Sequence, residues 1–142
     1  MLMKVRKTIV AEMERVAREA ARHSYCPYSK FPVGAAVLTD TGEIFSGCNI
    51  ENASIGLTNC AERTAIFQAV VNGCRGLAKV LVYTPTEKPA LPCGACRQVI
   101  NEFGPKAQVV SICDTDQRIE ACLNVLLPDT FEPSDLIGNT EK

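Results

Sequence analysis

Four short apolar runs place the strongest constraint on how this chain can fold. They span residues 33–38, 43–50, 79–83 and 108–113. Thr39-Asp40-Thr41-Gly42 joins the first two runs with residues that favour a tight turn, so these runs are predicted to form a hairpin. Helical patterns over residues 60–72 and 93–103 separate the later runs, and strands joined through helices require parallel crossovers. We therefore expect a three-layer α/β/α sandwich with a mixed five-stranded sheet.

The two ends of the chain carry weaker patterns. Apolar residues recur at spacings of three and four over residues 5–20, which predicts an amphipathic helix that covers the core and ends near His23. Residues 118–127 are ambiguous, and a fifth strand and a short helix before Pro128 would fit them. The tail after Asp135 is predicted to be weakly ordered.

Length and charge limit the classes of function. The 142 residues, with 46% hydrophobic content, suit one domain spanning 1–142. The 15 basic and 16 acidic residues nearly cancel, so no basic stripe is available for nucleic acid. No stretch approaches the ~20 apolar residues of a membrane span, and charged residues follow the N-terminus where a signal peptide would be apolar. We expect a cytoplasmic protein that binds neither nucleic acid nor membrane.

The chain contains eight cysteines, which could form a disulfide framework. The lack of a secretory signal and the ample apolar content favour reduced thiols instead. Five cysteines lie in segments without ligand spacing and are interpreted as small buried hydrophobic residues: Cys26, Cys48, Cys74, Cys113 and Cys122.

The other three cysteines have the spacing of a metal site. Cys93 and Cys96 lie one helical turn apart, although such a pair alone is also typical of a redox site. Cys60 begins the other predicted helix, and helices that follow successive strands start at the same edge of a sheet. Three convergent thiolates leave one position open for water, as in catalytic zinc sites. His23, the only histidine, is expected on the surface and not among the ligands.

Glu62 follows Cys60 by two residues and has two interpretations. Asn59-Cys60-Ala61-Glu62 fits a capping box with Asn59 as the cap. Alternatively, a carboxylate beside an open zinc site can take a proton from water and deliver it to a leaving group. The neighbouring thiols favour the catalytic interpretation.

Four motifs together resemble the small homotetrameric cytidine deaminases, from about Tyr25 to Phe131. They are FPVGAA at 31–36, GCNIENA at 47–53, CAERTA at 60–65 and PCGACRQV at 92–99. The resemblance implies one Zn²⁺ per subunit with a bound water or hydroxide, held by Cys60, Cys93 and Cys96, with Glu62 as proton shuttle. It implies pyrimidine salvage: hydrolysis of cytidine and deoxycytidine to uridine and deoxyuridine, with release of ammonia.

The same resemblance implies roles for further residues. Phe31 would pack on the pyrimidine ring, with a core role as the alternative, and the Ala61 backbone would donate to the base. Asn49 and Glu51 would bind the ribose 3′-hydroxyl. Phe131 would enter a neighbouring subunit's pocket, so that the active sites of a homotetramer are shared.

Three thiolates give a zinc site a formal charge of minus one, which weakens its ability to acidify water. The resemblance implies that Arg63 and Arg97 donate to the ligand sulfurs and withdraw charge. Ordinary surface charge is the alternative for both arginines.

The chain departs from the resembled family at Ile55, where tyrosine is common. Loss of an aromatic hydroxyl could reshape a pocket. An alternative substrate is therefore a modified cytidine or a cytosine nucleoside antibiotic such as blasticidin S. From another class of protein, a structural zinc module with Cys48 as fourth ligand would close the coordination sphere.

Overall fold

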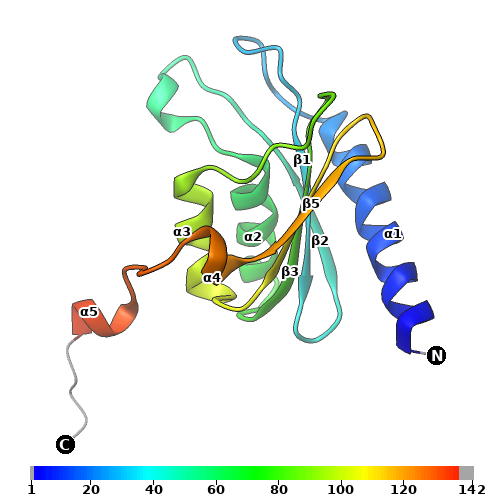
Figure 1. The fold of residues 1–142 in the computed structure, drawn as a ribbon. Coiled ribbons are helices and arrows are strands. Elements are labelled where there is room, and N and C mark those ends of the chain that lie inside the picture. Colours follow the sequence, from blue (N-terminus) through cyan, green and yellow to red (C-terminus); the bar gives the residue numbers. More distant parts are fainter. Residues whose placement is uncertain (1, 138–142) are drawn as a thin grey trace, which may run out of the picture.

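One five-stranded sheet forms the centre of the molecule in the computed structural model, which describes residues 2–137 and, for residues 2–6, the backbone alone. The strand order is β2-β1-β3-β4-β5 (Figure 1). Only the β3–β4 pair is parallel, so the sheet is mixed as predicted. The strands are β1 (Gly34–Thr39), β2 (Ile44–Cys48), β3 (Leu77–Tyr83), β4 (Gln108–Ile112) and β5 (Arg118–Cys122).

Helices cover both faces of this sheet, which confirms the three-layer prediction (Figure 1). Helix α1 lies on one face, and α2 and α3 lie on the other. The helices are α1 (Leu2–Ala21), α2 (Ala61–Val71), α3 (Gly94–Phe103), α4 (Leu123–Leu126) and α5 (Pro133–Ile137), with a 3₁₀ turn η1 (Ile55–Leu57).

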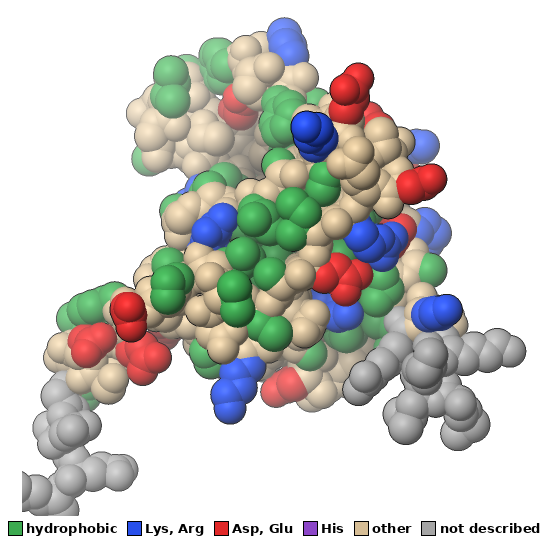
Figure 2. All heavy atoms as spheres, in the orientation of Figure 1, with side chains coloured by type: hydrophobic (Ala, Val, Ile, Leu, Met, Phe, Trp, Pro, Cys, Tyr) green, Lys and Arg blue, Asp and Glu red, His purple; other side chains and the backbone are tan. Residues whose placement is uncertain are grey.

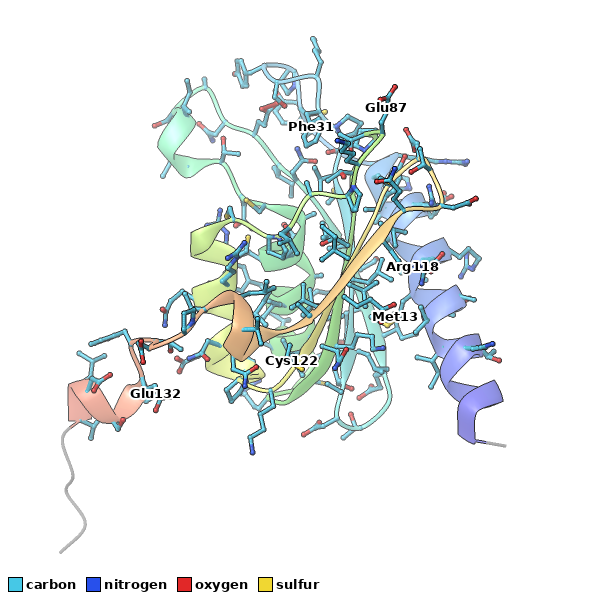
Figure 3. All side chains as sticks on the ribbon, viewed as in Figure 1. Met13, Phe31, Glu87, Arg118, Cys122 and Glu132 are labelled. Atoms are coloured by element: carbon cyan, nitrogen blue, oxygen red, sulfur yellow. The ribbon has the colours of Figure 1, made fainter. Side chains whose placement is uncertain are left out.

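Alternation along the strands divides the core into two parts. Ala35 and Val37 of β1 face α2 and α3, whereas Ala36, between them, faces α1. Met13 is fully buried and points from α1 toward the sheet (Figure 3). This two-sided burial explains why the strand sequences are apolar on both faces.

Two glycines allow helices to approach the sheet closely. A Cβ at Gly34 would overlap the backbone of α1 at Ala17, and a Cβ at Gly47 would overlap the backbone of α2 at Ala61 and Ala65. Gly47 therefore sets the distance between β2 and the first turns of α2.

The ambiguous residues 118–127 form β5 and the one-turn helix α4. β5 is an exposed edge strand, so its sequence lacks the apolar signal of the inner strands. The loop predicted before α2 contains η1, and His23 is exposed as expected. Of the tail predicted to be weakly ordered, residues 138–142 lie outside the described residues, and α5 ends at Ile137. Among the described residues, no helix has the length and apolarity needed to cross a membrane.

Candidate active site

A cavity of about 310 Å³ opens at one end of the sheet. Val82 and Thr84 line it at the carboxyl end of β3, where the starts of α2 and α3 also converge. Figure 2 shows the surface hollowed between the η1 region and the helix layer. The wall is completed by Ser29, Phe31, Val33, Asn49, Glu51, Thr58, Asn59, Cys60, Ala61, Glu62, Ala90, Leu91 and Cys93.

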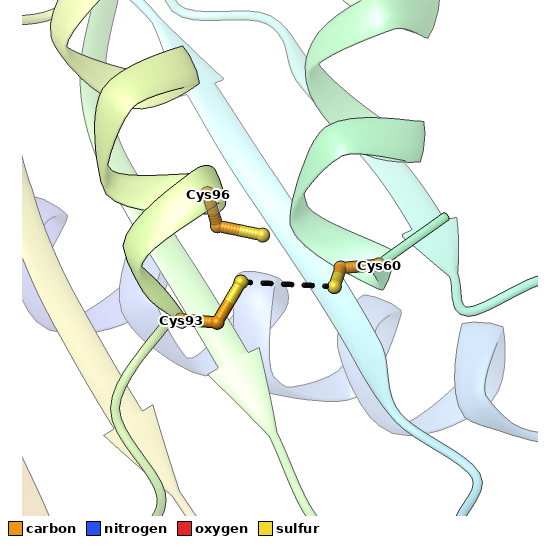
Figure 4. Close-up of side chains that lie close together, drawn as sticks. All are labelled: Cys60, Cys93 and Cys96. Carbon is orange, nitrogen blue, oxygen red and sulfur yellow. Dashed lines mark hydrogen bonds between the residues drawn. The ribbon is translucent and has the colours of Figure 1, made fainter. Parts of the chain in front are cut away.

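Three thiols meet beside this cavity. Cys60 is the N-cap residue of α2, Cys93 is the N-cap residue of α3, and Cys96 lies in the first turn of α3. The three Sγ atoms lie within 4.8 Å of one another, and those of Cys60 and Cys93 are 3.9 Å apart (Figure 4). Cys93 is exposed and Cys96 is fully buried. The two helix starts therefore bring together all three predicted ligands.

The donor set fits zinc. Thiolates bind Zn²⁺ at ~2.3 Å, so two of them in a tetrahedral site are roughly 3.8 Å apart. The Cys60–Cys93 separation of 3.9 Å agrees with this value. Cys48, the fourth ligand of the structural-module alternative, is not part of the convergent group. Three ligands are the number found at catalytic zinc sites with an open position.

Without metal, the thiols of Cys60 and Cys96 have pKa values shifted in opposite directions. A hydrogen bond from Cys96, followed by the hydrogen bond and positive charge of Arg63, lowers the pKa of Cys60 to about 5. The hydrogen bond to Cys60 and burial raise the pKa of Cys96. Cys60 therefore ionises more readily than Cys96, and the N-terminal end of α2 further favours the Cys60 anion.

Glu62 lies in the first turn of α2, and its side chain is almost completely buried. Burial raises the pKa of its carboxyl group, and the negative charge of Cys60 raises it further. The capping-box interpretation is wrong, because α2 begins at Ala61 with Cys60 as the cap. Asn59 instead donates from Nδ2 to Thr64 Oγ1 over 3.1 Å. A buried carboxyl with a raised pKa at a cavity wall is suited to proton transfer.

The two arginines that follow the cysteine motifs differ in their contacts. Arg63 Nη2 lies 3.4 Å from Cys60 Sγ and 3.4 Å from the Thr58 carbonyl oxygen. Arg97, expected to donate to a ligand sulfur, donates to the carbonyl oxygens of Pro92 and Leu126. Of the two, only Arg63 has a hydrogen bond to a thiol among the described residues.

Asn49 and Glu51 line the cavity and also hold the loop that carries Phe31. Asn49 Nδ2 donates to the Phe31 carbonyl oxygen over 2.8 Å, and Asn49 Oδ1 accepts from the Val33 amide over 2.9 Å. The Glu51 carboxylate accepts from the amides of Tyr28 and Ser29 over 3.1–3.2 Å. The chain reverses toward β1 here, and the Phe31 ring lies at the cavity wall.

The remaining predicted residues lie in different places. Ala61 is fully buried at the cavity, and its amide begins α2 without a partner inside that helix. Phe131 does not line this cavity, and 55% of it is exposed. Ile55 is 78% exposed in η1 and also lies outside the cavity wall. The cavity of a single chain is therefore not shaped by Ile55.

The loop before α3 supplies wall residues that sequence reasoning missed. Thr84 is buried and its Oγ1 is 2.8 Å from Thr86 Oγ1, while Ala90 and Leu91 line the cavity just before Cys93. Figure 3 shows Phe31 at the same end of the molecule as Glu87 in this loop. The available sequence signal was proximity to the PCGAC motif.

Comparison with known proteins agrees with this geometry. Residues 7–112 match the model of the cytidine and deoxycytidylate deaminase zinc-binding region. Cytidine deaminase of Sporosarcina psychrophila is 49% identical over 121 residues, which are 84% of this chain and 89% of that protein. The crystal structure of cytidine deaminase from Burkholderia pseudomallei superposes with a TM-score of 0.82 at 45% identity, covering 85% of this chain and 98% of that one.

Proposed function

Since the chain belongs to the cytidine and deoxycytidylate deaminase family, we propose that it hydrolyses cytidine and deoxycytidine to uridine and deoxyuridine, releasing ammonia. One observation carries the proposal: Cys60, Cys93 and Cys96 converge at a cavity whose wall also contains Glu62. A three-thiolate site and a buried acid together supply what hydrolytic deamination needs.

The three cysteines would hold one Zn²⁺. Zinc in such a site polarises water so that it releases a proton near neutral pH. The guanidinium of Arg63 on Cys60 Sγ withdraws part of the excess thiolate charge and so supports this polarisation.

Glu62 carries the protons of the reaction. Its carboxylate accepts a proton from the attacking water and delivers it to ring N3, while the water oxygen forms a bond to C4. It then transfers the second water proton to the amino group, which departs as ammonia. The raised pKa of Glu62 brings the carboxyl group closer to the pH at which it must both accept and release protons.

Substrate binding follows from the cavity wall. The Phe31 ring offers an aromatic face for the pyrimidine, and the Ala61 amide offers a donor to the base. Asn49 Oδ1 already accepts from Val33 and Ser24, so this side chain serves the ligand through its amide N–H. Glu51 accepts from the same sugar hydroxyl, which must therefore act as both donor and acceptor.

Assembly and location complete the proposal. The exposed Phe131 ring is suited to entering the site of another copy, in a homotetramer with shared active sites. A cytoplasmic location and a part in pyrimidine salvage remain predictions from the sequence, as does the absence of nucleic-acid and membrane partners.

The test combines metal analysis with a substrate panel. Purified protein should contain one zinc per chain and should convert cytidine and deoxycytidine, followed by the ultraviolet change and by ammonia release. Free cytosine should react poorly because it lacks the sugar contacts, and chelation followed by Zn²⁺ should abolish and restore turnover. A blasticidin S arm tests the alternative substrate. A protein that binds zinc and deaminates none of these compounds would overturn the proposal and favour a non-catalytic zinc module.

A further inference from the structure

Arg97 directly follows the ligand Cys96, yet its guanidinium contacts backbone oxygens instead of sulfur. Nε donates to the Pro92 carbonyl oxygen over 2.8 Å, and Nη1 donates to the Leu126 carbonyl oxygen over 2.7 Å. We propose that Arg97 is a positioning residue that fixes Cys93 through the preceding carbonyl and ties it to the C-terminal segment, residues 126–131. This inference rests on the proposed function only in taking Cys93 as a zinc ligand.

The Pro92 contact acts on the ligand that has the least support from packing. Cys93 is exposed, whereas Cys96 is fully buried in α3. Residues 84–92 before Cys93 form neither helix nor strand. The Pro92 carbonyl belongs to the peptide unit that ends at the Cys93 nitrogen, so holding that oxygen orients the plane from which the Cys93 side chain departs.

The Leu126 contact supplies the second anchor. Leu126 ends α4, where carbonyl groups lack partners within the helix. The planar guanidinium reaches Leu126 and Pro92 together because its donors point in fixed, diverging directions. A lysine at position 97 would keep the charge but would present a single ammonium group and could not reproduce both contacts in this geometry.

Two further residues of α3 extend this connection along the C-terminal segment. Gln98 Nε2 donates to the Phe131 carbonyl oxygen over 3.0 Å, and Asn101 Nδ2 donates to Thr130 Oγ1 over 2.9 Å. The helix that carries two candidate metal ligands at its start, Cys93 and Cys96, thus also holds the segment that presents Phe131. Of these three α3 residues, Arg97 is the one that contacts both the loop before α3, at Pro92, and the C-terminal segment, at Leu126.

The test measures zinc release from the holoenzyme to a chromogenic chelator, without substrate. Arg97→Lys should release zinc about 10- to 100-fold faster than the unchanged protein, in line with the fall in metal affinity when groups that orient metal ligands are removed. Arg75→Lys is the matched control, because Arg75 also donates to carbonyl oxygens, those of Val70 and Cys74, but at the far end of α2. Unchanged release from Arg97→Lys, or equal acceleration in both variants, would overturn the inference.

A spectroscopic readout separates positioning from general loosening. In Co²⁺-loaded protein, Arg97→Lys should alter the visible cobalt–thiolate bands, because the geometry of Cys93 changes. Gln98→Ala removes only the Phe131 contact and should leave these bands unchanged while amides near residue 131 exchange faster. Bands that are unaltered in Arg97→Lys, or a chain that binds neither metal, would refute the positioning role. Zinc binding without deamination would refute the proposed function alone.

Discussion

The starts of α2 and α3 are built alike but serve different purposes. Each has a cysteine as its N-cap residue, and each has an arginine within the first turn. At α2, the turn also buries Glu62, and Arg63 donates to the Cys60 sulfur. At α3, the turn buries the second thiol, Cys96, and the contacts of Arg97 within residues 7–137 are to carbonyl oxygens.

This difference indicates separate roles for the two halves of the site. We call the start of α2 with Cys60, Glu62 and Arg63 the α2 half, and the start of α3 with Cys93, Cys96 and Arg97 the α3 half. The α2 half contains the buried acid Glu62 and the Arg63–Cys60 contact, which fits the proton transfer and charge compensation proposed above. The α3 half contains two of the three candidate metal ligands, and Arg97 connects it to Pro92 and Leu126. Substitutions in the α2 half and in the α3 half should therefore change different measured properties.

The largest expected effect separates chemistry from metal binding. Glu62→Gln keeps the size of the side chain but cannot carry a proton, so kcat should fall roughly 10²–10⁴-fold. Zinc content should stay near one per chain, because the candidate metal ligands are Cys60, Cys93 and Cys96. Glu102→Gln on the exposed side of α3 is the matched control and should retain activity. Near-normal turnover in zinc-loaded Glu62→Gln would contradict the catalytic role proposed for Glu62 in the α2 half.

The second effect tests whether the position of α2 matters apart from its side chains. Gly47→Ala places a Cβ against the α2 backbone and should cost about 1–3 kcal/mol of unfolding free energy, with a fall in kcat. Gly34→Ala overlaps α1 on the other face and should destabilise to a similar degree. Denaturant unfolding and activity at a temperature where both variants are folded provide the comparison. Equal activity losses in the two variants would mean that overall stability, and not the placement of α2, limits turnover.

A third effect concerns the charge at Cys60. Its pKa is depressed in the folded, metal-free protein, so its ionised form stabilises that protein above the pKa of the unfolded chain, and this stabilisation is lost as pH falls through about 5. Arg63→Gln removes a positive charge and a donor, so the pKa should rise, the stabilisation should be smaller, and its loss should be complete at a higher pH. Acid-driven zinc release should shift in the same direction, because protons compete for the thiolate. An unshifted release curve, compared with Arg75→Gln, would count against the Arg63–Cys60 contact.

The smallest effect is expected outside both halves. Ile55→Tyr changes a side chain that is 78% exposed, so unfolding free energy should change by no more than about 0.5 kcal/mol. Turnover of dilute, dissociated chains should be unaffected because Ile55 does not line their cavity. A change in KM confined to concentrations at which copies associate would place residue 55 in a neighbour's site. A change in the dissociated chain would show that η1 reaches its own cavity.

The inner strands were predictable because burial on both faces leaves short continuous apolar runs in the sequence. The strand runs around Val37, Val80 and Val110 are apolar on both faces because helices cover both sides of the sheet. β5 lies at the edge with Ile119 partly exposed, so the same rule gave no clear pattern there.

Within the site, local spacing was informative and distant contacts were not. One helical turn brings Cys93 and Cys96 together, and two helix starts at one sheet edge bring Cys60 to them. The partner of Arg97 at Leu126 lies 29 residues away in a segment without periodicity, so spacing alone could not separate it from a sulfur donor. Asn59 pairs with Ile50 in an isolated β-bridge, so α2 begins after this pair, with Cys60 as its N-cap residue. Local spacing did not predict this long-range pairing.

Asn49 and Glu51 hold the Phe31 loop with the same side chains that face the cavity. A mutation at either position would remove contacts that hold the loop and would also change a residue proposed to bind the sugar. During evolution, these two positions are therefore poor routes to a new substrate. Changes in the loop before α3, where Ala90 and Leu91 contribute wall without fixing Phe31, offer a route with fewer side effects.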